Sequence, residues 1–148
     1  MVRLISLLLL GTLLFSFYSV SESDNSCTLS VEFSNIRNKE GSLFIFLYNY
    51  ENQFPDNPFK YFEVKKDNIS NNRLLVNIPN LVKGKYAISI IDDENDNADL
   101  DRFLGIPKEG YGFSNNVKPI LSMPKYQELL FDLNQERMLL NLKLQYVL

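Results

Sequence analysis

The sequence predicts an all-β protein, an antiparallel β-sandwich of about seven strands with an immunoglobulin-like or transthyretin-like arrangement. Short segments alternate apolar and polar residues with the period of two that is typical of half-buried strands. Turn residues separate these segments, and none of them has the longer period of an amphipathic helix. The chain has 148 residues, of which 45% are hydrophobic, so its length and composition fit one domain with a packed core.

The N-terminal segment, residues 1–21, has the order of a secretory signal peptide. Arg3 precedes a run of Leu, Ile and Phe, and small residues follow near Ser19. We expect cleavage after Ser21 or Ser23, which leaves a single domain over residues 28–148 that is exported to the periplasm or the exterior. An uncleaved anchor is the alternative, but the apolar run is short for a span of about 20 residues. No membrane span is therefore expected after cleavage.

The only cysteine, Cys27, allows no intramolecular disulfide. A lipid-modified Cys27 would be another route to the envelope. Asp24 disfavours this route, because it occupies the position three residues earlier where lipoprotein signals usually carry an apolar residue. With one Cys and no His, the chain also lacks the ligands of a structural zinc site and the imidazole of Ser-His-Asp or Cys-His catalysis.

The first two expected strands differ, because one is apolar on a single face and the other is apolar on both faces. Residues 28–33 place Leu29, Val31 and Phe33 on one side, as a half-buried strand does. Residues 42–50 (SLFIFLYNY) are apolar on both sides, which indicates a central strand that is covered twice. Prolines then mark a turn-rich connection over residues 51–59, before a short strand at 61–66.

Three further segments alternate in the same way: residues 73–78, 86–91 and 138–147. We expect Pro79 to end the first of them, because proline cannot donate a ladder hydrogen bond. The residues 126–133 fit either a short helical turn or a strand.

A long segment, residues 92–116, follows the strand at 86–91 and is expected to be one functional loop. Its first ten residues hold six carboxylates and no base. Leu100, Phe103, Leu104, Ile106, Tyr111 and Phe113 give it apolar material that we expect it to bury.

The acidic half of this loop has side chains spaced as in a calcium site. Counted from Asp93, the candidate ligands occupy the first, third, fifth, seventh and ninth positions of an EF-hand-like loop. Ala98 stands where the sharp turn wants Gly, and Leu104 replaces the bidentate acid, so a distant acid such as Glu109 would have to close the site. The alternative is an Asp/Asn-rich turn without metal. The candidate ligands for Ca²⁺ are Asp93, Asn95, Asn97, Asp99 and Asp101.

The second half of the loop combines glycines, aromatic rings and amides, which suits contact with a protein, peptide or glycan. The alternative is that Ile106, Tyr111 and Phe113 fold back and cap the core. The sequence does not identify a ligand. The candidate recognition residues are Lys108, Glu109, Tyr111, Phe113, Asn115 and Asn116.

The segment LVKGKYAISIIDDENDNADLDRFLGIPKEGYGFSNN resembles a bacterial secreted family, domain of unknown function 2141. That family shows a Gly-Lys/Thr-Tyr turn, then HDENxNGxLD, then FLGIPKEGYGFSNN, and residues 103–116 match the last motif almost letter for letter. Here Asp92 replaces the family's His and Ala98 replaces its Gly. The resemblance covers roughly residues 28–147. It implies an exported β-sandwich and no established activity.

The net charge of −3 disfavours nucleic-acid binding, which needs a basic surface. The sequence therefore favours a binding or cell-envelope interaction module. One alternative is a small metal-assisted or carboxylate-based hydrolase, with Asp93 and Asp101 as acid and base. Another is a purely structural accessory domain.

Overall fold

The computed structural model describes residues 26–119 and 122–148. The predicted signal peptide, residues 1–21, and both predicted cleavage sites lie outside the described residues. No helix within the described ranges has the length and apolar composition needed to cross a membrane.

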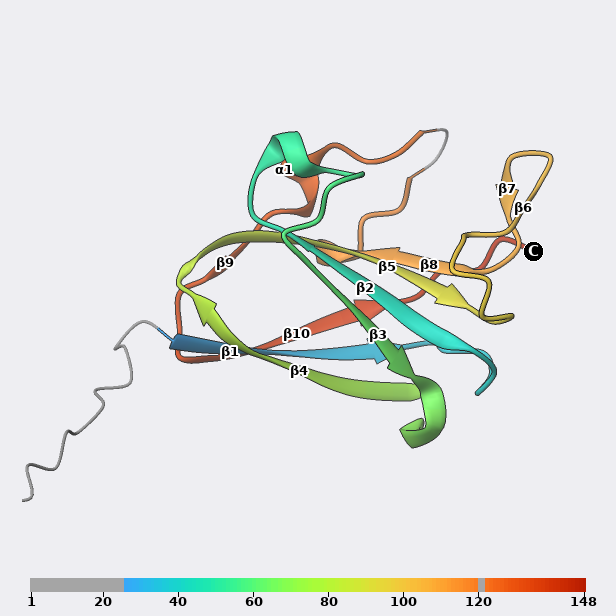
Figure 1. The fold of residues 1–148 in the computed structure, drawn as a ribbon, viewed down its shortest axis with the longest axis horizontal. Coiled ribbons are helices and arrows are strands. Elements are labelled where there is room, and N and C mark those ends of the chain that lie inside the picture. The colour runs from blue at the N-terminus through green and yellow to red at the C-terminus, as the bar shows by residue number, and fades with distance from the viewer. Residues whose placement is uncertain (1–25, 120–121) are drawn as a thin grey trace, which may run out of the picture.

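Two sheets pack face to face (Figure 1). The first has the order β10-β1-β4, and the second has the order β3-β2-β5-β8, with β9 also paired to β5. The strands of the first sheet are β1 (Ser26–Ser34), β4 (Arg73–Val82) and β10 (Arg137–Lys143). Those of the second are β2 (Ser42–Tyr48), β3 (Lys60–Lys65), β5 (Gly84–Asp93), β8 (Gly110–Phe113) and β9 (Phe131–Leu133).

The predicted all-β sandwich is confirmed, with one exception to its antiparallel pairing. The register joins β1 to β10 in parallel, with Leu29 opposite Met138 and Phe33 opposite Leu142. Alternation of apolar residues shows which face of a strand is buried, but it does not carry the direction of the neighbouring strand. The sequence pattern therefore could not reveal the parallel pair.

The core lies between the two sheets and consists of the residues that alternate inward. Leu29, Val31 and Phe33 of β1 are fully buried, as are Ile45 of β2 and Ile88 of β5. These side chains belong to one contiguous apolar cluster that receives contributions from both sheets. Burial of such side chains contributes about 1.5–3 kcal/mol each, so this cluster is the main source of stability.

The predicted end of a strand at Pro79 is wrong, because β4 continues to Val82. β4 is an edge strand of its sheet, so on its open side no neighbouring strand requires the N–H group that proline lacks. The register with β1 also shifts between Cys27 and Leu29, and Asn80 has a φ of +60°. The irregular pairing at this point accommodates the proline without ending the strand.

The prediction of one long loop over residues 92–116 is also wrong. β5 continues through Asp93, β8 is a paired strand of the second sheet, and η3 (Ser114–Asn116) follows it directly. Between β5 and β8, β6 (Arg102–Phe103) and β7 (Ile106–Pro107) form a hairpin. Figure 1 shows this hairpin projecting from the body of the protein.

The expected burial of the apolar loop residues is confirmed at Phe113, which is buried in an apolar cluster, but it fails at the hairpin. Phe103 is 60% exposed, Leu104 is 87% exposed and Ile106 is 42% exposed. Each hairpin strand has only two residues, so the side chains at the tip do not reach the core.

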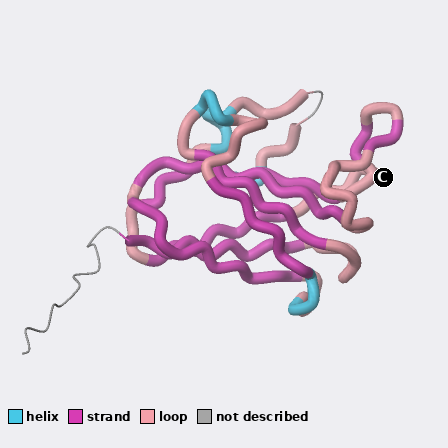
Figure 2. Tube along the Cα trace, in the orientation of Figure 1, coloured by secondary structure: helices cyan, strands magenta, loops and turns pink. Residues whose placement is uncertain are grey.

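Short helices cover part of the outer face of the second sheet (Figure 2). Residues 126–133 contain both structures that the sequence allowed, a helical turn α1 (Tyr126–Leu129) followed by β9. Tyr126 and Leu129 pack on Tyr48 and Phe113, in a second apolar cluster. Two further turns are η1 (Glu51–Gln53) after β2 and η2 (Lys66–Asn68) after β3.

We predict that Gly41→Ala destabilises the fold far more than Gly105→Ala. Both glycines have positive φ, +70° and +82°. A Cβ at Gly41 would lie 1.9 Å from the Asp93 carbonyl oxygen, whereas a Cβ at Gly105 meets nothing within 4 Å. Gly105→Ala should cost about 1 kcal/mol of unfolding free energy, and Gly41→Ala roughly 3 kcal/mol or more, in urea titrations. Equal losses in the two variants would contradict the clash.

Candidate functional site

The last two residues of β5 carry carboxylates that point to opposite faces of the sheet. Asp92 follows Ile88 and Ile90 on the inner face, and Asp93 lies on the outer face. Both residues are fully buried, which is unusual for aspartate. The end of β5 is therefore the point from which the candidate site is built.

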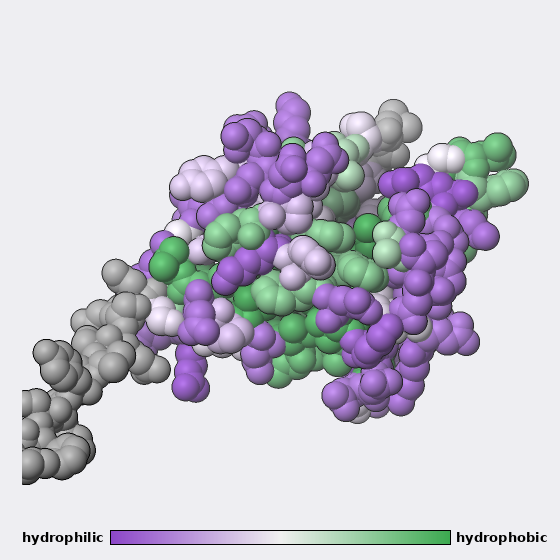
Figure 3. Space-filling view, in the orientation of Figure 1, coloured by the Kyte–Doolittle hydropathy of each residue, from purple (hydrophilic) through white to green (hydrophobic). Residues whose placement is uncertain are grey.

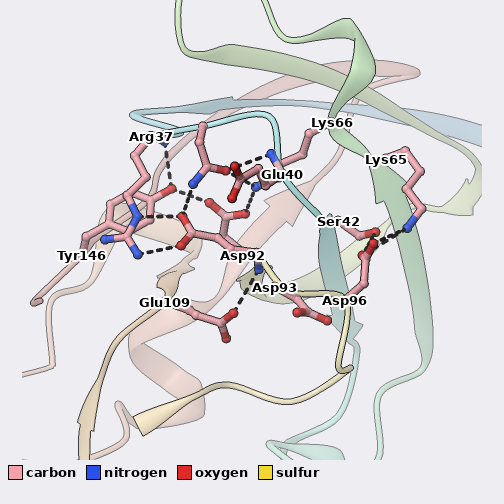
Figure 4. A network of polar contacts seen from close by, with 12 residues as sticks. Arg37, Glu40, Ser42, Lys65, Lys66, Asp92, Asp93, Asp96, Glu109 and Tyr146 are labelled. Atoms are coloured by element: carbon pink, nitrogen blue, oxygen red, sulfur yellow. Dashed lines mark hydrogen bonds and ion pairs between the residues drawn. The ribbon is translucent and has the colours of Figure 1, made fainter. Parts of the chain in front are cut away.

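A buried ion pair neutralises Asp92 (Figure 4). Its Oδ1 lies 2.6 Å from Lys66 Nζ, and both side chains are fully buried. Lys66 is the first residue of η2 and also donates to Asn38 Oδ1 at 3.1 Å. The Tyr146 hydroxyl donates to Asp92 Oδ2 at 2.5 Å. Each carboxylate oxygen thus has a close donor, as a buried charge requires.

Burial raises the pKa of both acidic groups in this cluster, the Asp92 carboxyl and the Tyr146 hydroxyl. Burial raises the pKa of Asp92, and the hydrogen bonds from Lys66 and Tyr146 oppose that rise. Burial and the hydrogen bond to Asp92 both raise the pKa of the Tyr146 hydroxyl far above its ordinary value. Tyr146 therefore acts as a neutral donor to a carboxylate.

Gly110 allows the Tyr146 ring to reach this position. A Cβ at Gly110 would lie 2.4 Å from the ring carbon Cε1. Gly110 is the first residue of β8, so the strand and the ring pack directly on each other.

A second ion pair closes the same end of the sandwich at the surface. Arg37 donates from Nε to Glu94 Oε1 and from Nη2 to Glu94 Oε2, both at 2.6 Å. Its guanidinium lies 4.7 Å from the centroid of the Tyr146 ring and also donates to the Lys108 carbonyl. The hydrogen bonds from Arg37 lower the pKa of Glu94. This bidentate pair links the start of the acidic segment to the residues after the hairpin.

Glu109 joins the two ends of the acidic segment. Its Oε1 accepts from the Glu94 N–H and its Oε2 accepts from the Asp101 N–H, each at 3.0 Å. Glu109 is only 4% exposed. The side chain, which was predicted to take part in recognition, fixes the base of the segment in the structure.

The predicted calcium ligands lie close together and bond mainly to one another. The Asp93 carboxylate accepts from the N–H groups of Asn97 at 3.2 Å and Ala98 at 2.7 Å. Ala98 has a φ of +62°, the left-handed conformation expected at this turn. The Asp101 carboxylate accepts from the side-chain amides of Asn95 at 2.9 Å and Asn97 at 3.1 Å.

The other acids of the segment are also engaged. Asp99 Oδ1 accepts from the N–H of Leu100 at 2.8 Å. Asp96 contacts Lys65 at 3.1 Å and accepts from the Ser42 hydroxyl at 2.8 Å. Among the described residues, no three acidic, Cys or His side chains are grouped so as to hold a metal ion.

The predicted recognition residues separate into structural and surface positions. Asn115 donates to the carbonyls of Glu128 and Leu130, and Asn116 bonds to the backbone of β10. These two amides hold α1 and β10 in place. Tyr111 and Phe113 lie on the outer face of the second sheet, where Phe113 is buried in the second apolar cluster and Tyr111 is partly buried, and Lys108 is exposed.

The register builds two apolar rows on that outer face. Phe46 lies opposite Tyr61 on one side and Ser89 on the other, and Phe44 lies opposite Ile91, which lies opposite Tyr111. Tyr61 is 68% exposed, while the other aromatic residues of the two rows are partly or fully buried. These rows on the outer face were not predicted from the sequence. The apolar residues on both sides of β2 could have indicated them.

Two open depressions adjoin the buried ion-pair cluster, since Tyr146 lines one of them and Arg37 and Asn38 line the other. One is lined by residues that include Asn35, Lys118 and Lys143, and the other by residues that include Arg37 and Asn38. Neither is lined by Asp93 or Asp101.

We predict that Lys66→Met lowers the free energy of unfolding by about 3–5 kcal/mol, because it leaves Asp92 buried without its counter-ion. The double variant Lys66→Met, Asp92→Leu should recover most of the loss. The control is Lys85→Met, since Lys85 and Asp132 lie 3.8 Å apart with side chains 68% and 64% exposed. The control should change stability by about 0.5 kcal/mol or less in urea titrations. A double variant no more stable than Lys66→Met would contradict the ion pair.

Comparison with known proteins supports the resemblance that the loop motif suggested. A family model described as "Uncharacterized protein conserved in bacteria (DUF2141)" matches residues 31–140. No curated protein and no solved structure matches. The position at which the family motif carries His holds the buried Asp92 of the ion pair with Lys66. Because the match spans most of the chain, this protein belongs to the DUF2141 family of uncharacterised bacterial proteins.

Proposed function

We propose that this protein is an exported binding module that contacts a macromolecular partner through the outer face of its second sheet. The observation that carries the proposal is the two rows of mainly apolar side chains on that face, of which the row through Phe46 ends at the exposed ring of Tyr61. Aromatic side chains on a rigid surface bury a large area at a low cost in conformational entropy.

The outer face has a covered part and an open part. Tyr48, Ala87 and Phe113 are buried under Tyr126 and Leu129. The remaining part, towards β3, carries Tyr61 and ends beside Glu63 and Lys65. Apolar side chains with polar residues at the margin are the composition of an interface core and its rim.

The face is held rigid at the loop end. Asp96 bonds to Ser42 of β2 and to Lys65 of β3, which ties the acidic segment to the open part of the face. Glu109 and Arg37 fix the two ends of that segment. A rigid surface binds without ordering costs, so this network favours recognition.

Calcium binding by the acidic segment is a second candidate function. It is favoured by the turn that Asp93 forms with Asn97 and Ala98, and by the approach of the Asn95 and Asn97 side chains to Asp101. Rotation of the two amides would turn their oxygens towards Asp101, and oxygen is the ligand that Ca²⁺ prefers.

The hydrolase alternative has no comparable support. The Asp93 carboxylate accepts two backbone N–H groups, and the depressions described above do not include Asp93 or Asp101. The structural accessory domain remains the alternative if no partner binds.

We predict that Tyr61→Ser abolishes capture of a partner without unfolding the protein. Tagged full-length protein would be incubated with a detergent-solubilised bacterial envelope extract, and bound components quantified by mass spectrometry. Loss of the exposed ring should reduce retention about tenfold or more. Leu75→Ser is the matched control, because Leu75 is 56% exposed on the other sheet. Equal retention by wild type and both variants, or no retention, would contradict the proposal.

We predict that Ca²⁺ releases or absorbs heat on titration into the protein in calorimetry, with a dissociation constant of about 0.1–1 mM. The double variant Asp93→Asn, Asp101→Asn should show no binding heat. Glu63→Gln is the control, since Glu63 is acidic but lies outside the predicted ligand set. A flat trace for the wild type at millimolar Ca²⁺ would remove this function and leave the sheet face unaffected.

A further inference from the structure

The β6–β7 hairpin has an unusual tip. Arg102 pairs with Pro107 and Phe103 pairs with Ile106, which leaves a turn of two residues. These are Leu104 with a φ of +50° and Gly105 with a φ of +82°. Two consecutive positive φ values are the pattern of a type I′ turn, in which Asn-Gly is the favoured pair.

Leu104 is unfavourable at this position for two independent reasons. A non-glycine residue without a short polar side chain is strained at positive φ. The side chain is also 87% exposed, so it gains nothing from burial within the protein. Asn at this position would relieve both costs. Folding of the hairpin therefore does not account for Leu104, and such local penalties concentrate at functional sites.

The tip is amphipathic along its length. Phe103 and Ile106, which are 60% and 42% exposed, flank Leu104 and complete an apolar cap. Figure 3 shows the apolar residues at the end of the projecting hairpin and hydrophilic residues below them. Arg102 and Lys108 are the cations at the base of the cap, and both are exposed.

These two cations differ from the neighbouring acids in having no partner. Within the described residues, neither the Arg102 nor the Lys108 side chain has an ion pair or a hydrogen bond. The carboxylates of Asp93, Asp101 and Glu109, in contrast, all accept hydrogen bonds from the protein. The hairpin base therefore presents positive charge that is free to contact a ligand.

We propose that the hairpin tip inserts into a lipid bilayer surface, with Phe103, Leu104 and Ile106 at the acyl boundary and Arg102 and Lys108 among the phosphate headgroups. A strand residue rises about 3.3 Å, so the turn stands roughly 3–7 Å beyond the cations. That spacing matches the depth of about 5–10 Å to which interfacial segments are buried.

A bilayer fits the shape and charge of the tip better than a protein groove. The tip is a convex wedge, which a lipid surface accepts without a preformed cavity. The two-residue strands offer no edge for an added strand. The net charge of −3 opposes an anionic surface at long range, so apolar insertion supplies most of the binding and anionic lipid adds a smaller part.

Vesicle sedimentation of the full chain tests this contact. The probes are vesicles of phosphatidylcholine alone and of phosphatidylcholine with phosphatidylglycerol. Leu104→Asn should lower the bound-to-free ratio about tenfold on both. Its midpoint of urea unfolding should stay the same or rise, because Asn-Gly suits the turn. Arg102→Gln with Lys108→Gln should lower binding only to the vesicles that contain phosphatidylglycerol.

Two controls separate the tip from other surfaces. Leu75→Asn removes an exposed leucine from the other sheet, and Tyr61→Ser removes the ring on which the proposed sheet-face binding depends. Both should bind vesicles like the wild type. The proposal is overturned if the wild type does not bind, if Leu104→Asn binds like the wild type, or if Leu75→Asn loses as much. Since Tyr61 and the tip are varied separately, failure of one contact leaves the other testable.

Discussion

The buried ion pair between Lys66 and Asp92 is the interaction on which the loop end of the sandwich depends. Neither charge is tolerable alone in this position, because an unpaired buried charge costs several kcal/mol. Tyr146 and Asn38 satisfy the remaining polar atoms, so the cluster brings together η2, β5, the segment after β1 and the segment after β10. Four parts of the chain that are distant in sequence are thereby fixed at one point.

The acidic segment is organised by this fixed point. Asp92 directs the end of β5 inward, and Asp93, the next residue, turns outward to hold the N–H groups of Asn97 and Ala98. Glu109 and the pair between Arg37 and Glu94 then close the segment at its base. Much of the acidic charge of residues 92–101 therefore serves to shape the segment, which presents the projecting hairpin.

The functional proposals rest on apolar side chains that remain after the fold is complete. The inner faces of the two sheets account for the main core, and the outer face of the second sheet is only partly covered by α1 and by Phe54. Tyr61 and Leu104 are the most exposed of the remaining apolar side chains on that sheet and on the hairpin. They belong to different surfaces, one suited to a macromolecular face and the other to a lipid surface.

The sequence by itself determined the all-β class, the six longer strands and the family, because alternation with a period of two and a specific motif are local properties. It missed β6, β7 and β8. It also indicated an Asp/Asn-rich turn after Asp93, because side chains such as those of Asn95 and Asn97 bond to the N–H group two residues further on. Only the tertiary structure decided the parallel pairing of β1 with β10 and the partners of Asp92. Lys66 and Tyr146 lie 26 and 54 residues from Asp92, and no periodic pattern records such contacts. Likewise, only the tertiary structure decided whether Phe103, Leu104 and Ile106 are buried. The short hairpin strands keep these side chains at the surface.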